Sequence, residues 1–138
     1  MLSFLAAASR PCLQQGLFEP FRGYTYFGVI SILHNSVARH LRHLRERRLE
    51  HLCAGDRPLG LSVAEVEGGD STYERMLTVG TALRDEDGAE VIIMGCAGMA
   101  RHREALQDAL GVPVIDPVQA AATIAIGTVS LASRPAAA

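Results

Sequence analysis

Residues 89–99, AEVIIMGCAGM, decide the fold of this chain. The run VIIM at residues 91–94 has no polar alternation, which is typical of a strand buried on both faces of a parallel sheet. Gly95 and Cys96 break the run, and a helical pattern follows from about Ala100. Cys96 is therefore expected at the carboxyl end of a buried strand, the edge at which open α/β sheets bind ligands.

Strand and helix patterns alternate on both sides of this stretch. The expected strands are residues 24–33, 59–66, 91–94 and 112–115, and the expected helices are residues 37–52, 71–88, 101–110 and 118–131. Such alternation implies βαβ units with right-handed crossovers. The sequence therefore predicts an α/β fold, a single lobe with a four-stranded parallel sheet flanked by helices.

Capping residues support three of these helices. Asn35 or Ser36 is a suitable N-cap for the helix at residues 37–52, and Ser71 with Glu74 fits a capping box for the next. Asp116 is followed by Pro117, a favoured first helical residue, and so predicts the start of the last helix.

Length, charge and cysteine content limit the domain count and the kinds of partner that can be expected. With 138 residues the chain is long enough for one domain, expected at residues 24–132, with a poorly ordered lead-in at 1–23 and a tail at 133–138. A net charge of −2 gives no reason to expect nucleic acid or a membrane as partner. Three cysteines without metal-ligand spacing are typical of cytoplasmic thiols, so a cytoplasmic location is expected.

Polar and reactive groups follow three of the expected strands. His34, Asn35 and Ser36 follow the first, Cys96 the third, and Asp116 the fourth. In a parallel sheet these ends share one edge, where amides at helix N-termini can seat a carboxylate or an imide oxygen. Such amides would also stabilise a Cys96 thiolate. On spacing alone the alternative stays open, since a free cysteine often packs as a small apolar residue.

Other candidate sites are weaker. His40, His43, His51 and Cys53 could suggest a metal cluster, but the histidines lie among arginines on what is expected to be the solvated face of a helix. The same run, RHLRHLRERRLEH, is more typical of a solvated face than of a nucleic-acid contact. The glycines form no phosphate-loop or dinucleotide fingerprint. No metal and no cofactor are expected.

The phrases GAEVIIMGCAGMA and LGVPVIDPVQAA, with FGVISILHNSV at the first strand, resemble the second lobe of the aspartate/glutamate/hydantoin racemase family. The form GCAGM is closer to the hydantoin and allantoin racemase branch than to the glutamate racemases, and the resemblance covers residues 27–129. It implies a lobe with flavodoxin-like layering. It also implies a cofactor-independent racemase of an amino acid derivative, such as a hydantoin, whose two lobes each supply one thiol.

Carried over by position, the resemblance makes Cys96 the acid/base thiol of the second lobe. Ala97 and Gly98 would offer backbone N–H groups, and Asn35 and Ser36 would help to bind the carboxylate or imide group of a small-molecule substrate. In such a site one thiolate removes the Cα proton while a thiol protonates the opposite face.

The chain departs from that pattern because only about two dozen residues precede the matched lobe. Cys12, in SRPCLQQG, follows no apolar strand and is a poor substitute for the missing first-lobe thiol. The chain therefore looks truncated, or two copies pair as a homodimer to rebuild a two-lobed site. The alternative function is that of a catalytically inactive remnant lobe that binds a small anionic ligand or a protein partner.

Overall fold

The computed structural model describes residues 25–68 and 71–132. The expected lead-in, the expected tail and Cys12 lie outside the described residues. The elements in chain order are β1 (Phe27–Ser31), α3 (His34–Glu46), the 3₁₀ helix η2 (Glu50–Leu52), β2 (Cys53–Pro58), α4 (Val63–Gly68), α5 (Thr72–Asp85), β3 (Val91–Met94), the 3₁₀ helix η3 (Ala97–His102), α6 (Arg103–Leu110), β4 (Val114–Ile115) and α7 (Pro117–Ala132).

The four strands form one parallel sheet in the order β2-β1-β3-β4. β1 is central and pairs with β2 on one side and with β3 on the other. β3 is the strand expected from the VIIM run, and its register places Ile30 beside Met94. The predicted α/β fold with a four-stranded parallel sheet is confirmed.

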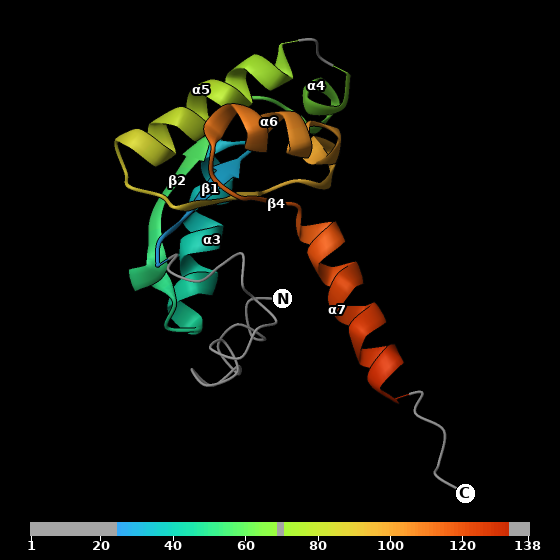
Figure 1. The fold of residues 1–138 in the computed structure, drawn as a ribbon. Coiled ribbons are helices and arrows are strands. Elements are labelled where there is room, and N and C mark those ends of the chain that lie inside the picture. Colours follow the sequence, from blue (N-terminus) through green and yellow to red (C-terminus); the bar gives the residue numbers. More distant parts are fainter. Residues whose placement is uncertain (1–24, 69–70, 133–138) are drawn as a thin grey trace, which may run out of the picture.

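Helices cover both faces of this sheet (Figure 1). Side chains alternate between the faces along a strand, so Gly28 and Ile30 of β1 point to one face and Ser31 to the other. A Cβ built on Gly28 would meet Leu83 of α5, whereas the Ser31 hydroxyl meets His40 of α3. α5 and α6 therefore pack on one face and α3 on the opposite face.

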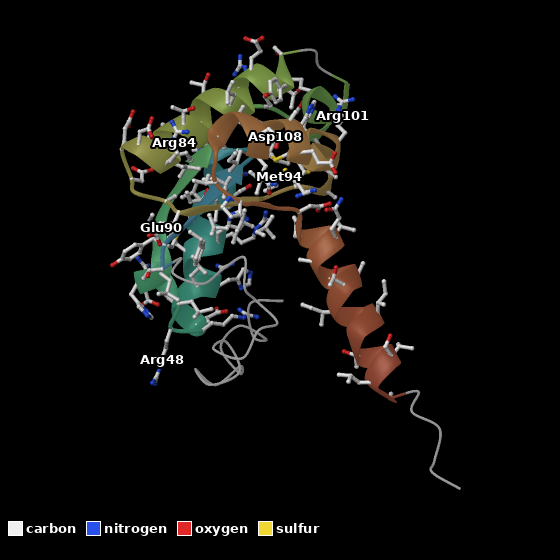
Figure 2. The ribbon with its side chains drawn as sticks, viewed as in Figure 1. Arg48, Arg84, Glu90, Met94, Arg101 and Asp108 are labelled. Carbon is white, nitrogen blue, oxygen red and sulfur yellow. The ribbon has the colours of Figure 1, made fainter. Side chains whose placement is uncertain are left out.

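The main core lies between the sheet and α5 and α6. Met94 is fully buried there, at the centre of the molecule in Figure 2, whereas Arg48 beyond α3 points away from the body. Met76, Leu83 and Leu106 join the same buried cluster. The helix expected at 71–88 therefore buries the face that its apolar spacing predicts, although it ends at Asp85.

The second strand lies at Cys53–Pro58, so the prediction of a strand at residues 59–66 is wrong. The segment CAGDRP has little β-propensity, but β2 is an edge strand that pairs only with β1 and stays partly exposed along its length. An edge position also tolerates Pro58. Leu59 and Leu61 are buried without belonging to a strand, which explains the misleading apolar pattern.

The capping box lies one helix earlier than predicted. Ser62 precedes α4, its amide donates to the Glu65 carboxylate at 2.7 Å, and the Glu65 amide donates back to the Ser62 hydroxyl at 3.4 Å. Ser71 does precede α5, but its side chain makes no capping hydrogen bond, so the box expected from Ser71 and Glu74 is wrong.

α7 extends away from the rest of the fold (Figure 1). Asp116 caps it as predicted, because the Val118 amide donates to a carboxylate oxygen of Asp116 at 2.9 Å. No side chain of α7 is fully buried, and Ile126 is 67% exposed. Within residues 25–68 and 71–132, no helix is long and apolar enough to cross a membrane.

Candidate functional site

The strand order creates a switch point between β1 and β3. The connection that follows β1 passes through α3 on one face, whereas the connections on either side of β3 pass through α5 and α6 on the other. In open α/β sheets the carboxyl edge at such a switch point is where ligands bind, and we call this edge, between the segments that follow β1 and β3, the crevice. The segments that follow β1 and β3 border this crevice, and they contain the residues expected to form the site.

Cys96 lies directly beyond β3 and is half-buried. Its backbone is extended, with φ −145° and ψ 139°, and it stands immediately before η3. Part of its side chain packs against the main core. The Met99 amide donates to the Cys96 carbonyl at 3.2 Å. Cys96 is therefore fixed by the turn that follows it while part of its surface stays accessible at the crevice.

Ala97 and Gly98 form the first turn of η3. Amides at the start of a helix have no acceptor within that helix, so these two are free of intrahelical partners by position. Ala97 is exposed and Gly98 half-buried. The carboxyl end of β3 thus offers a thiol and two neighbouring N–H donors.

Asn35 and Ser36 lie in the first turn of α3, across the switch point from Cys96. The prediction that Asn35 or Ser36 is the N-cap of this helix is wrong. The helix begins at His34, and its N-cap is Leu33, which makes no side-chain capping bond. The Ser36 amide donates to the Leu33 carbonyl at 3.0 Å. The Asn35 side chain is exposed, and that of Ser36 is half-buried.

The surroundings of Asp116 and Cys53 indicate structural roles and not a part in the site. Asp116 is buried and its carboxylate caps α7. Cys53 begins β2, at the end of the sheet opposite to the crevice. Burial raises the pKa of its thiol to about 11, and the negative charge of nearby Asp56 adds to this effect. A thiol with so high a pKa stays protonated near neutral pH. Among the described residues, no group of three or more His, Cys, Asp or Glu side chains could hold a metal ion.

A polar network beneath the crevice was not foreseen. His40 Nδ1 lies 2.8 Å from Asp56 Oδ2 and 3.2 Å from the Ser31 hydroxyl, which in turn donates to Asp56 Oδ1. The Asp56 side chain is 2% exposed and that of His40 is 25% exposed. His40 is therefore not on a solvated face, contrary to the prediction. The arginines around His40 favoured a solvated face, and its partner Asp56 lies in β2, a strand that the sequence pattern did not indicate.

Comparisons with known proteins identify the family of this chain. The family model described as Asp/Glu/hydantoin racemase matches residues 7–125. Hydantoin racemase of Paenarthrobacter aurescens is 39% identical over 107 residues, which is 76% of this chain and 45% of that protein. Hydantoin racemase of Rhizobium meliloti is 39% identical over 100 residues, 72% of this chain and 42% of that protein.

Two solved structures share the fold. Allantoin racemase from Pseudomonas fluorescens superimposes with a TM-score of 0.73 at 32% identity, over 83% of this chain and 54% of that one. Allantoin racemase from Klebsiella pneumoniae gives 0.70 at 29% identity, over 78% of this chain and 44% of that one. The chain thus spans about half the length of the relatives it matches. It belongs to the Asp/Glu/hydantoin racemase family.

Proposed function

We propose that this chain is one lobe of a cofactor-independent racemase that inverts the Cα centre of an amino acid derivative such as a hydantoin. The observation that carries the proposal is the position of Cys96, a half-buried thiol at the switch point, followed by two amides at the start of η3. Membership of the racemase family supports the reaction class, and the names of the relatives, hydantoin and allantoin racemase, support the substrate class.

The chemistry requires acid/base groups on both faces of the substrate. The Cys96 thiolate takes the Cα proton, forming its S–H bond, while the electron pair of the broken C–H bond moves into the neighbouring carbonyl as an enolate. A thiol on the opposite face then protonates Cα, and the electron pair returns to carbon. In the reverse direction Cys96 supplies the proton.

Donors at the crevice would stabilise the enolate and orient the ring. The amides of Ala97 and Gly98 suit an oxygen that gains negative charge during the reaction. Asn35 and Ser36, from the first turn of α3, suit the carboxylate or imide group. Preorganised donors of this kind usually contribute more to the rate than any other single feature.

Within the part of the chain that the structure describes, no second thiol lies at the crevice, so we infer that another lobe supplies it. The described residues contain two cysteines, and Cys53 lies at the wrong end of the sheet. We propose that a second copy of the chain supplies the opposite face, so that a homodimer holds one Cys96 on each side of the substrate. The exposed apolar side chains of α7, among them Val118 and Ile126, are suited to burial in such a contact.

A second function has its own support. The chain spans about half the length of the relatives it matches, and among the described residues Cys96 is the thiol at the crevice. An inactive lobe would keep the amide donors and bind a small anionic ligand or a protein partner without turning it over. Only the racemase requires Cys96, because anion binding by amides does not involve the thiol.

The experiment that separates the two functions is deuterium uptake at Cα of a chiral 5-substituted hydantoin in D₂O. The racemase predicts uptake by the wild-type chain and its loss in Cys96→Ser. An inactive lobe predicts no uptake by either protein, together with hydantoin-induced shifts of the Ala97 and Gly98 amide resonances that survive Cys96→Ser.

A further inference from the structure

The first turn of α3 has few means of its own to stay in place. α3 buries a single side chain completely, Leu44, which lies in the last turn of the helix. At the other end, the N-cap Leu33 makes no side-chain capping bond and the first turn contains no acidic residue. Full apolar burial therefore holds the carboxyl end of α3, whereas the end that carries Asn35 and Ser36 follows Ile32, whose carbonyl accepts from the Gly60 and Leu61 amides. A side-chain interaction that ties this end of the helix to the sheet would add to these backbone bonds.

The network of Ser31, His40 and Asp56 provides that interaction. Ser31 is the last residue of β1 and is fully buried, Asp56 belongs to β2, and His40 lies near the middle of α3. The network thus ties the helix to both strands beneath it. It also closes the segment from Ser31 to His40, which begins at the end of β1 and includes the whole first turn of α3.

The hydrogen bonds define the state of the imidazole. The Ser31 hydroxyl donates to Asp56 Oδ1. A carboxylate oxygen can only accept, so the contact of 2.8 Å between His40 Nδ1 and Asp56 Oδ2 assigns the proton to Nδ1. The Ser31 oxygen, at 3.2 Å, is a second acceptor for the same proton. In the neutral ring Nε2 then carries no proton. A carboxylate that is 2% exposed loses much of its stabilisation if either donor is removed.

We propose that His40 and Asp56 are positioning residues that hold the first turn of α3, with Asn35 and Ser36, at the crevice beside Cys96. The importance of that placement for substrate rests on the proposed racemase function. The attachment of α3 to the sheet does not depend on that function, because it is argued from the hydrogen bonds of His40 and Asp56 and from the lack of a side-chain cap on α3.

Three variants of the full chain test the proposal. His40→Ala removes the donor, whereas His40→Asn keeps an N–H close to the position of Nδ1 and is expected to rescue it. His43→Ala is the matched control, because His43 lies one turn further along α3, its side chain is 49% exposed, and that side chain pairs with Glu46 on the same helix and not with the sheet. Backbone amide exchange of residues 34–38 is measured in each, along with KM and kcat for racemisation.

If His40 is a positioning residue, His40→Ala should affect the start of α3 and leave the rest of the chain unchanged. In His40→Ala the amides of residues 34–38 exchange about tenfold faster, and KM rises about tenfold with kcat within about twofold, as expected for loss of one hydrogen bond to a charged group. His40→Asn stays close to wild type, and His43→Ala is unchanged. Faster exchange throughout the chain, no change at residues 34–38, or equal effects of Ala and Asn at position 40 would overturn the proposal.

Nitrogen NMR of the histidine rings gives a readout that folding alone does not move. In the wild-type chain neutral His40 should show a protonated Nδ1 and an unprotonated Nε2. Asp56→Asn places an N–H where the carboxylate accepts a hydrogen bond. It should therefore shift the tautomeric equilibrium of the His40 ring toward the form protonated at Nε2. A wild-type ring protonated at Nε2 would contradict the network. Absence of racemisation by the wild type would remove the substrate role, while exchange and tautomer would still decide the holding of α3.

Discussion

The Gly95 amide donates a hydrogen bond to the Ile30 carbonyl at 2.8 Å, and this bond joins the carboxyl ends of β3 and β1. A Cβ built on Gly95 would lie 2.7 Å from the same carbonyl oxygen and 3.4 Å from the Ser31 Cα. The two strands therefore approach each other at the switch point more closely than any other residue would permit. Cys96 follows immediately, so this approach sets where its thiol lies relative to the first turn of α3.

Gly95→Ala should destabilise the fold and displace Cys96. The added methyl group meets backbone, which cannot move aside as a flexible side chain would, so the free energy of unfolding should fall by about 1 to 3 kcal/mol. Urea denaturation measures it. Gly127→Ala in α7 is the matched control, since a Cβ there meets nothing within 4 Å and helix propensity predicts a gain of up to about 1 kcal/mol. Equal stability of Gly95→Ala and wild type would contradict the close approach.

Ser62→Ala should release the start of α4. The Ser62 hydroxyl and amide both bind the Glu65 carboxylate, and these bonds lower the pKa of Glu65. Without the hydroxyl, the amides of α4 should exchange faster while those of β3 stay protected. Ser71→Ala is the control, because the Ser71 side chain makes no capping bond to α5. If the two variants behave alike, the capping box does not hold α4.

The fold could be predicted from the sequence wherever pattern and burial coincide. The run at β3 is apolar because the strand is covered on both faces, and Asp116 with Pro117 marks the start of α7 through local hydrogen bonding that needs no distant partner. Gly111 ends α6 in the left-handed conformation, in agreement with a helix expected to end at residue 110. Each of these signals depends on neighbours in sequence.

β2 could not be predicted, because its stability comes from a distant partner. The segment CAGDRP becomes a strand by pairing with β1, and its polar residues have uses that only the folded chain reveals. Asp56 binds Ser31 and His40, and Arg57 binds Asp87 after α5. The S-x-x-E pattern at Ser62 was a local signal for α4 that the apolar spacing around it concealed.

The part of the candidate site that follows from local sequence signals was predictable, and the part that depends on distant partners was not. Cys96, Ala97 and Gly98 follow a strand that the pattern identifies, so their place at the sheet edge follows from topology. The network of Ser31, His40 and Asp56 joins three elements, one of which had been misplaced. No spacing rule within α3 distinguishes His40 from the exposed His43.

Acid should weaken the attachment of β2 to the end of α5. Arg57 donates to both carboxylate oxygens of Asp87 at 2.7 and 2.9 Å, and these bonds hold the pKa of Asp87 below its ordinary value of 3.8. A pKa that is lower in the folded chain than in the unfolded chain gives stability above the ordinary value, which is lost as the pH falls through the lowered one.

Arg57→Met should therefore be less stable than wild type near neutral pH, and the difference should shrink as the pH falls below the ordinary Asp value of 3.8. Urea denaturation across this range measures the difference. Arg42→Met is the control, because Arg42 is exposed and makes no ion pair among the described residues. A difference between wild type and Arg57→Met that persists unchanged in acid would show that the arginine acts by packing alone.

α7 should contribute to association and little to the stability of the lobe. Ile126 is 67% exposed, so Ile126→Gln should change the free energy of unfolding by no more than about 0.5 kcal/mol while lowering self-association in sedimentation equilibrium. Leu106→Ala, at a fully buried position in α6, should cost about 2 to 5 kcal/mol. Strong destabilisation by Ile126→Gln, or unchanged association, would contradict a role of α7 in pairing.

Deuterium uptake at Cα of a chiral 5-substituted hydantoin tests the role of Cys96 most directly. Wild type and Cys96→Ser are compared in D₂O, with Cys53→Ser as the matched variant because Cys53 is the other described thiol and lies at the opposite end of the sheet. Uptake is expected with wild type and Cys53→Ser, and the rate should be at least about a hundredfold lower in Cys96→Ser. Equal rates in wild type and Cys96→Ser, or no uptake by any of the three, would contradict the role of Cys96.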